Sequence, residues 1–431
     1  MTIDQRKPGL AACLAISWLV IGCGPIDSLL GKEPNPSCRK PGCVPPDSSN
    51  TCASNADCEP PGVCDVMDSK QCVPCTPEQP AACSGTTPAC GMDHMCRACT
   101  AHTDCALSSA CLPDGSCAAE FDVAYVDPAG TDNTTCSRSM PCSTVKKALM
   151  AAKPYVKFHG TIDETVVVSK RAVTFLADPG AKLTHTAGGG DVLTVQNDVP
   201  SLAIYDLAIA DIRDNTSVGL SVPVGAATQV SLTRVSISNN AGFGISIGNG
   251  SLTLVQSVIS GNGRGGVSVN GDAKFAIVGN VFLVNGTATT ARGALEVSTA
   301  EATTNRLEFN SFHGNAARSG VGAAIQCSAG QFTARNNIMF MNGTLNTFEQ
   351  VGGNCGHAYS IAMPGTLPPG IGNLAADPRF KDTAQGDLHL LPGSPAIRAA
   401  DPESNLTGLA ERDIDGAART RPATLGAYQM P

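Results

Sequence analysis

The chain has 431 residues, a net charge of −8 and a pI near 5.4, with charged residues at only 15% and aromatic residues at 4%. No basic cluster is interleaved with aromatic residues, which argues against a nucleic-acid partner, and the composition is neither that of a disordered chain nor that of a typical helical enzyme. The 45 glycines instead favour many short strands and turns, in a chain long enough for two or more domains.

The N-terminus predicts an export signal. Arg6 and Lys7 form a basic start, and the apolar run LAACLAISWLVIGC follows. Its last four residues, VIGC (20–23), resemble the lipobox of bacterial lipoproteins, which implies cleavage before Cys23 and lipid attachment to its thiol. We therefore expect residues 1–22 to be a lipoprotein signal peptide and residues 23–51 a lipidated tether. An ordinary signal peptide or a short buried helix is the alternative. The lipid would anchor an exported protein to the outer membrane or cell surface of a Gram-negative bacterium.

Residues 52–120 are expected to be cysteine-rich repeats. Three similar units, residues 52–72, 75–96 and 99–117, each carry four cysteines. Two CxxC pairs at the joints, 72/75 and 96/99, have the spacing of a zinc ribbon. Disulfides are the preferred interpretation, because an exported chain meets an oxidising environment and units with so few apolar residues need covalent cross-links. The spacing leaves the connectivity open. The segment is expected to be a rigid spacer, with a protein-binding module as the alternative.

From about residue 155 a short phrase repeats. An apolar residue followed three positions later by Asn recurs six times, at steps of 25, 22, 23, 30 and 27 residues. The asparagines of this ladder are Asn215, Asn240, Asn262, Asn285, Asn315 and Asn342. Another column of asparagines, at positions 280, 310 and 337, appears in the last three turns of the repeat. This pattern predicts a parallel β-solenoid whose stacked coils share one core. The asparagines are expected to be structural corner residues that tolerate a left-handed backbone and bond to one another through their amides.

The same repeat predicts a cross-link between coils. Cys327 follows Asn315 by 12 residues, and Cys355 follows Asn342 by 13 residues. The two cysteines therefore fall at nearly the same place on successive coils, about one strand spacing apart, which suits a disulfide.

Residues 121–431 resemble the right-handed parallel β-helix of the pectin lyase-like superfamily. The stretch YVDPAGTDNTTCSRSMPCSTVKKALMAA (125–152) is similar to the opening segment of such proteins, which implies a strand, a loop closed by Cys136 and Cys142, and a capping helix with Ser143 or Thr144 near its N-cap. The run ADPRFKDTAQGDLHLLPGSPAIRAAD, with DIDGAARTRPATLGAY behind it, is similar to the choice-of-anchor Q module. The expected class is all-β, with a β-helix and its N-terminal cap over 121–373 and the module over 374–431.

The resemblance implies where an active site would lie. Enzymes of this superfamily that cut acidic polysaccharides use stacked carboxylates with calcium, or two or three aspartates on neighbouring coils. Here the second repeated phrase, GISI or GVSV, carries a different outward column: Ser221, Ser246, Ser268, Glu296 and Gln326. Asp211 and Asp214 in the stretch DIRD are the catalytic candidates, with a turn role as the preferred alternative. The stretch DIDG (413–416) resembles a calcium-binding loop, but a turn without metal is the preferred interpretation. No residue is therefore assigned as a metal ligand. Calcium is the one cofactor that the sequence leaves open.

We therefore predict a non-catalytic envelope lipoprotein that displays a β-helix. Its expected partners are the membrane, through the lipid anchor, and a polysaccharide or an envelope protein. One alternative is a polysaccharide lyase or glycoside hydrolase, which is favoured if Asp211, Asp214 and an acidic group from a neighbouring coil converge in a groove. The other alternative is a structural adhesin with a flat, repetitive face.

Overall fold

The computed structural model describes residues 51–79, 82–225, 227–299, 304–329, 332–344 and 347–430. The predicted signal peptide, the predicted lipidation site Cys23 and most of the tether lie outside these residues. Within the described part of the chain, no helix is long and apolar enough to cross a membrane.

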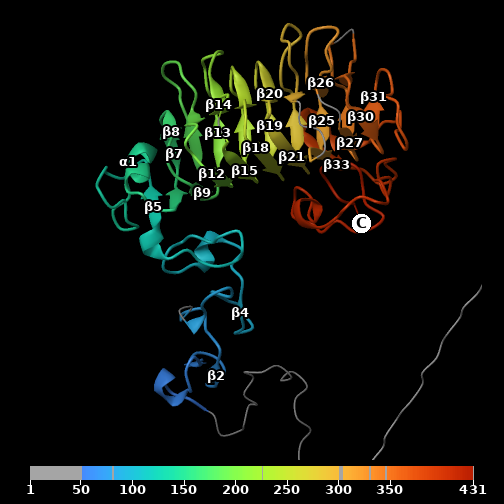
Figure 1. The fold of residues 1–431 in the computed structure, drawn as a ribbon. Coiled ribbons are helices and arrows are strands. Elements are labelled where there is room, and N and C mark those ends of the chain that lie inside the picture. The colour runs from blue at the N-terminus through green and yellow to red at the C-terminus, as the bar shows by residue number, and fades with distance from the viewer. Residues whose placement is uncertain are drawn as a thin grey trace, which may run out of the picture.

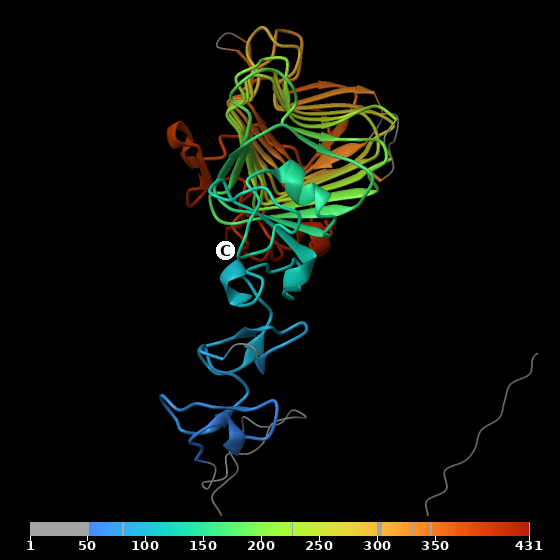
Figure 2. The same ribbon diagram turned by 90° about the vertical axis from the view of Figure 1, so that its left-hand side faces the viewer.

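Residues 123–363 wind into a solenoid in which each coil contributes a strand to each of three parallel sheets (Figure 1). The view along the solenoid from its N-terminal end shows the three sheets enclosing one core (Figure 2). The predicted all-β solenoid preceded by a disulfide-rich region is confirmed.

The three sheets are named by their numbers of strands. The ten-stranded sheet contains β5 (Val123–Val126), β6 (Tyr155–Phe158), β9 (Val173–Ala177), β12 (Ser201–Tyr205), β15 (Gln229–Thr233), β18 (Ser251–Val255), β21 (Lys274–Val278), β24 (Arg306–Glu308), β27 (Thr333–Arg335) and β30 (Gly356–Ala358). The nine-stranded sheet contains β7 (Thr161–Asp163), β10 (Lys182–Thr184), β13 (Ala208–Ala210), β16 (Ser236–Ser238), β19 (Val258–Ser260), β22 (Val281–Leu283), β25 (Ser311–His313), β28 (Ile338–Phe340) and β31 (Ile361–Met363). The eight-stranded sheet contains β8 (Val166–Val168), β11 (Leu193–Val195), β14 (Val218–Val222), β17 (Phe243–Ile247), β20 (Gly265–Gly271), β23 (Leu295–Thr299), β26 (Ile325–Ala329) and β29 (Val351–Gly353).

The core is built from columns of identical or similar side chains. In the nine-stranded sheet, Ile209, Ile237 and Ile259 are in register on successive coils and fully buried, and Phe282 and Phe312 continue the column. The two phenyl rings stack with centroids 4.7 Å apart and an interplanar angle of 12°. No coil can bury such a face alone, so each coil depends on its neighbours for stability.

From β12 to β29, each coil turns at two corners through a residue in the left-handed conformation. One corner joins the ten-stranded sheet to the nine-stranded sheet, and the other joins the nine-stranded sheet to the eight-stranded sheet. The left-handed residues are Asp206, Arg234, Gln256, Gly279, Phe309, Asn336 and Tyr359 at the first corner, and Asp211, Asn239, Gly261, Val284, Gly314 and Met341 at the second. The ladder asparagines themselves are not left-handed, contrary to our expectation: each follows the left-handed residue and is fully buried.

Buried amides connect the coils at the second corner. The Nδ2 of Asn262 donates to the Oδ1 of Asn285 at 2.8 Å and to the carbonyl of Ile237 at 3.0 Å. The Oδ1 of Asn285 also accepts the backbone N–H of Asn262, so one side-chain oxygen serves two donors of the preceding coil. The same pattern runs from Asn240 to Asn342. A second, shorter ladder at the first corner contains Asn280, Asn310 and Asn337.

The prediction that Asn215 is the first rung is wrong. Asn215 is exposed in the loop after the corner. The register pairs Ile209 with Ile237, so the ladder position of this coil is occupied by Ile212, whose backbone N–H donates to the Oδ1 of Asn240 at 3.3 Å. The repeat was misaligned by three residues here because Ile212 and Ile209 both fit the apolar position of the pattern.

The structure pairs Cys327 with Cys355 and Cys136 with Cys142, with Cα–Cα distances of 5.8 and 4.9 Å. The second bridge closes the loop before helix α1 (Val145–Met150), which covers the N-terminal end of the solenoid (Figure 2). Thr144 is its N-cap and accepts the backbone N–H of Lys147.

The cysteine-rich repeats form three small units in series beneath the solenoid, here called the stalk (Figure 1). Each unit has two disulfides that join its first cysteine to its third and its second to its fourth: Cys52–Cys64, Cys58–Cys72, Cys75–Cys90, Cys83–Cys96, Cys99–Cys111 and Cys105–Cys117. The short elements of the stalk and its join to the solenoid are η1 (Asn55–Asp57), β1 (Val63–Cys64), β2 (Cys72–Val73), β3 (Ala89–Cys90), β4 (Cys96–Arg97), η3 (His102–Asp104) and η4 (Glu120–Asp122). This pairing confirms the prediction that the cysteines of the stalk form disulfides, in preference to the zinc-ribbon alternative.

Residues 364–430 pack beneath the C-terminal half of the solenoid (Figure 1). This segment contains β32 (Phe380–Asp382), η5 (Thr383–Gln385), β33 (Asp387–Leu390) and η6 (Gly408–Ala410). The contacts are made to the first corner: Arg335 forms an ion pair with Asp401 at 2.7 Å, and Asn336 donates to Ser404 at 2.7 Å. The segment therefore covers the corner column that the solenoid alone would leave exposed.

We predict that replacing Asn285 by Ala lowers the free energy of unfolding by about 2–4 kcal/mol, because two donors of Asn262 lose their acceptor in a buried site. Asn215→Ala is the matched control, and its effect should stay within about 0.5 kcal/mol because Asn215 is exposed. Both free energies are measured by urea unfolding, from curves that have the same dependence on urea concentration (the same m-value). Equal losses in the two variants would contradict the ladder as the stabilising feature.

The last coil makes stability depend on pH. His357 ends a core column after Leu307 and Ala334, it is 5% exposed, and burial lowers its pKa from 6.5 to about 4. The neutral form is favoured in the folded state, so this contribution to stability is complete above pH 6.5 and is lost as the pH falls towards 4. We predict that a loss of about 3 kcal/mol between these pH values is absent in His357→Leu. Denaturation curves recorded at several pH values measure this loss of stability. A variant whose stability depends on pH as in the wild type would contradict the prediction.

Candidate functional site

The two predicted catalytic aspartates serve local structure. Asp211 follows β13 and accepts from Lys182 Nζ of the preceding coil at 2.7 Å. Asp214 accepts the backbone N–H of Thr216 at 2.9 Å and the hydroxyl of Ser217 at 3.1 Å. The backbone N–H of Thr216 is the largest cause of the lowered pKa of Asp214. These contacts make both carboxylates parts of a corner and its turn.

No carboxylate cluster accompanies these aspartates in the described part of the chain. The only groups of three His, Cys, Asp or Glu ligand atoms within 4.8 Å of one another, among the described residues, consist of stalk cysteines. All of these cysteines are in disulfides. In the stretch DIDG, the Oδ1 of Asp413 accepts the backbone N–H groups of Asp415 and Ala417. This carboxylate therefore organises its own turn.

The outward column of the eight-stranded sheet is polar and in register. Ser221, Ser246, Ser268, Glu296 and Gln326 pair on successive strands in the predicted order. The hydroxyl of Ser268 donates to Glu296 Oε2 at 3.0 Å. Hydroxyl, carboxylate and amide groups thus lie side by side at strand spacing along this face.

Beside this column, two arginines lie against one aromatic ring. The guanidinium carbon of Arg264 is 5.4 Å from the ring centroid of Phe243, and that of Arg292 is 5.2 Å from it. Arg292 also forms an ion pair with Glu296. Arg264 is exposed, and the one hydrogen bond of its guanidinium to a described residue is a weak contact of 3.5 Å to the carbonyl of Asn215. We call Phe243, Arg264, Arg292 and Glu296 the Phe243 cluster.

Arginines recur in the loops after the second corner. Arg264, Arg292 and Arg318 lie in three successive loops between the nine-stranded and eight-stranded sheets. The backbone N–H of Arg318 donates to the carbonyl of Thr290 at 2.8 Å, so the last two loops are in contact. Each of the three loops therefore carries one arginine, and these three residues are here called the arginine row.

Charge is divided unequally between the two parts of the molecule. Residues 51–122 contain ten Asp or Glu and two Lys or Arg, a net charge of −8, whereas residues 123–431 contain 23 acidic and 22 basic residues, a net charge of −1. The β-helix is therefore nearly neutral, and an anionic partner that contacts the arginine row meets little repulsion from it.

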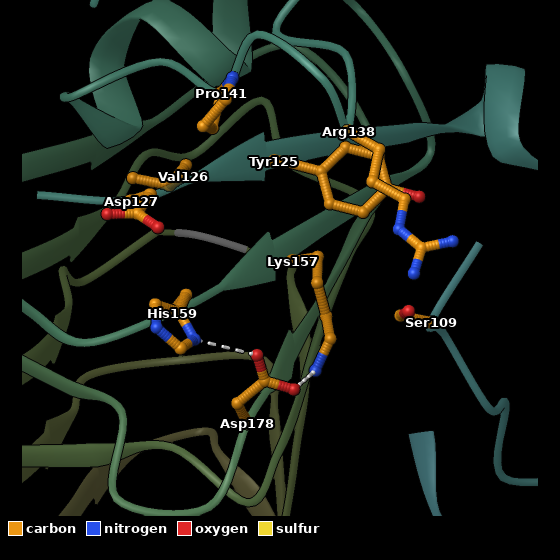
Figure 3. A pocket seen from close by; sticks show the side chains of 9 residues that line it. All are labelled: Ser109, Tyr125, Val126, Asp127, Arg138, Pro141, Lys157, His159 and Asp178. Atoms are coloured by element: carbon orange, nitrogen blue, oxygen red, sulfur yellow. Dashed lines mark hydrogen bonds and ion pairs between the residues drawn. The ribbon is translucent and has the colours of Figure 1, made fainter. Parts of the chain in front are cut away.

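A pocket of about 180 Å³ lies where the stalk meets the solenoid (Figure 3). On one side, Lys157 and His159 both reach the carboxylate of Asp178, with His159 Nδ1 3.1 Å from Asp178 Oδ2. Lys157 is only 3% exposed, and burial lowers its pKa, partly offset by Asp178. Burial alone would raise the pKa of Asp178, but the hydrogen bond and charge of Lys157 lower it. Both groups therefore stay ionised as a pair.

The other side of the pocket joins the third cysteine unit to the solenoid. Arg138 Nη1 donates to the carbonyls of Ala106 and Leu107 at 2.6 and 2.8 Å. The hydroxyl of Tyr125 donates to the carbonyl of Ser108 at 2.7 Å, and its burial raises its pKa to about 12. Beneath them Ala110, Ala118, Val123, Tyr125 and Leu176 form a small apolar cluster. This joint combines apolar burial with directed hydrogen bonds, so it fixes the orientation of the third unit.

These features define a class of protein: a parallel β-helix carried on a disulfide-linked stalk, with a polar face edged by arginines. The family model for a right handed beta helix region matches residues 210–360, and together with the three parallel sheets it identifies the solenoid as a right-handed parallel β-helix.

Comparison with individual proteins gives similarity to a solved structure but none to a curated protein. A search of curated proteins finds no match. Among solved structures, a pectate lyase, Pel9A, is similar at 15% identity and a TM-score of 0.40, covering 73% of this chain and 100% of that chain. That likeness carries no argument about activity.

Sequence reasoning did not find the Phe243 cluster. The sequence contains a signal for this cluster. When GFGISI (242–247) is aligned with GRGGVSV (263–269), Phe243 falls beside Gly265, which follows Arg264. Gly265 has a φ of +140°, and a Cβ there would lie 3.1 Å from the Phe243 ring and 3.2 Å from Arg292 Cβ. The absence of a side chain at this position allows the ring and the two arginines to meet.

We predict that Gly265→Ala lowers the free energy of unfolding by about 2–3 kcal/mol, because it adds steric crowding to a strained backbone. Gly320→Ala is the matched control: its φ is +81°, but nothing lies within 4 Å of the added Cβ. The control should cost only about 1 kcal/mol. Urea denaturation of both variants measures the difference, and equal losses would show that close packing at the cluster is unimportant.

Proposed function

We propose that this chain is a non-catalytic surface protein that binds an anionic polysaccharide through the Phe243 cluster and the polar column beside it. The observation that carries the proposal is the pair of guanidinium groups on Phe243, one of which, Arg264, makes only a single weak hydrogen bond. A guanidinium group held against a ring keeps its in-plane N–H donors directed outward, where they suit carboxylate or sulfate groups.

The arginine row matches an extended polymer better than a small ligand. Arg264, Arg292 and Arg318 come from three successive coils, which repeat at about 4.8 Å, so the positive charge is supplied by several coils along the axis. The side chains of Ser246 and Gln326 can bond to sugar hydroxyls next to those charges, whereas Ser268 is buried and bonds to Glu296. Phe243 is itself covered by the arginines, so the expected binding is electrostatic and polar with little aromatic stacking.

The remaining parts of the chain support display. In this proposal Cys23 carries a lipid that anchors the exported protein to the outer membrane or cell surface of a Gram-negative bacterium. The stalk raises the β-helix above that surface, and residues 374–430 act as a choice-of-anchor Q type module that closes its C-terminal half. The fixed joint around Arg138 and Tyr125 favours this role, because it holds the binding face at one angle to the stalk.

Two other functions remain testable against this proposal. A polysaccharide lyase or glycoside hydrolase would need Asp211 and Asp214 for chemistry, with calcium as a candidate cofactor, but both carboxylates are occupied by Lys182 and by the Thr216 turn. A structural adhesin, or a protein partner in the envelope, would use the same face without affinity for polysaccharide.

We predict that the full chain binds acidic polysaccharides such as polygalacturonate and alginate, but not dextran, and that raising the salt concentration to 0.5 M weakens this binding. The double variant Arg264→Ala/Arg292→Ala should lose at least about ten-fold in affinity, since it removes two ionic contacts. Lys170→Ala/Lys274→Ala is the matched control, because it removes two exposed charges elsewhere and should bind normally. Affinity is measured by co-sedimentation and calorimetry.

The same mixtures, with and without calcium, are assayed for unsaturated and reducing ends. Binding without product supports the proposal. Product formation that is lost in Asp211→Ala or Asp214→Ala would replace it with the enzyme, and neither binding nor product would replace it with the adhesin.

A further inference from the structure

His102 lies in the joint between the stalk and the solenoid, and both of its ring nitrogens are used there. It belongs to η3 of the third cysteine unit. Its Nε2 is 3.1 Å from the carbonyl oxygen of Ala177 at the end of β9, and its Nδ1 is 3.0 Å from the backbone nitrogen of Cys111. One ring therefore connects the solenoid to the loop of the third unit that carries a disulfide.

The partners determine the protonation state. The carbonyl of Ala177 can only accept, so Nε2 must carry a hydrogen. The backbone N–H of Cys111 can only donate, so Nδ1 must be unprotonated. The bridge therefore requires the neutral imidazole in its Nε2–H form. Protonation of Nδ1 would set two N–H donors against each other and break the bond to Cys111.

The surroundings oppose protonation. Burial lowers the pKa of His102, and the positive charge of Lys157 on β6 lowers it further. The carboxylates of Asp178 and Asp206, which follow β9 and β12, raise it. Both carboxylates are already paired, Asp178 with Lys157 and His159, and Asp206 with Arg234 at 2.6 Å. On its own element, Asp104 accepts from the backbone of Thr100 and Ala101 instead of from the ring.

We propose that His102 is a pH-sensitive latch that holds the loop of the third cysteine unit around Cys111 when neutral and releases this loop when protonated, while its Nε2–H remains bonded to Ala177. The other hydrogen bonds named across the joint persist between pH 7.5 and 4.5, because their donors and acceptors keep the same protonation state. Arg138 donates to two carbonyls, and Tyr125 donates to a carbonyl as a neutral phenol. Acidification therefore frees the loop around Cys111 while the third unit stays attached.

The test measures the latch directly in the full chain. Nitrogen-15 spectra of the imidazoles should show His102 as the Nε2–H tautomer at pH 7.5, titrating below pH 6.5. Hydrogen exchange of the Cys111 amide, read by mass spectrometry and corrected for the intrinsic rate, should lose at least about ten-fold in protection between pH 7.5 and 4.5.

Three variants separate the latch from general acid destabilisation through His357. His102→Asn keeps an oxygen acceptor near the position of Nδ1 but cannot be protonated, so protection of Cys111 should change little with pH. His102→Leu fills the space without either hydrogen bond, so protection should be low at both pH values. His94→Asn, in the second cysteine unit, should retain the wild-type response. A pH-dependent loss that persists in His102→Asn, or a protonated Nδ1 at pH 7.5, would overturn the proposal.

Discussion

The side-chain amide of asparagine, buried at the corner of each coil from Asn240 to Asn342, is the group on which the rest of this structure depends. A coil that turns through a left-handed residue leaves a backbone N–H pointing into the core, and a buried donor without an acceptor destabilises the fold. The Oδ1 of the asparagine one coil further on accepts that N–H, and its Nδ2 donates to the next oxygen in the ladder. The ladder thereby joins the same position of successive coils, and the strand register follows from it.

This regular frame positions the irregular parts of the molecule. The loops that carry Arg264, Arg292 and Arg318 all start from the second corner, and Arg264 and Arg292 meet on Phe243 although their loops differ in length. The first corner is used differently, since residues 364–430 cover it through Arg335, Asn336 and their partners. Residues 364–430 thus cover the first corner in the C-terminal half of the solenoid, and the second corner carries the arginine loops.

Much of the fold could be predicted from the sequence, because periodic features leave a periodic signal. The asparagine ladder from Asn240 to Asn342 and the outward column from Ser221 to Gln326 both lie where the repeat places them. The first rung was misplaced because Ile212 satisfies the same pattern as Ile209, and only the strand pairing distinguishes the two. The sequence does not determine which cysteines pair within each unit, since several pairings fit the same cysteine spacing.

The Phe243 cluster and the joint were missed for a different reason. Both depend on contacts between residues that have no fixed spacing: Arg138 reaches carbonyls more than 30 residues away, and His102 reaches Ala177 across 75 residues. A bond from a side chain to a backbone carbonyl leaves no trace in the identity of the accepting residue. Gly265 is the exception, because its missing side chain can be read in the sequence once its neighbours are known.

The disulfide pattern of the stalk makes its length adjustable. Each of the three units is closed by its own two bridges, and within the described residues no bridge passes from one unit to the next. Duplication or deletion of one unit in the gene would therefore leave every other pairing intact and would not disturb the β-helix core. The height at which the β-helix is held could evolve in whole steps, one unit at a time, independently of changes in the β-helix itself.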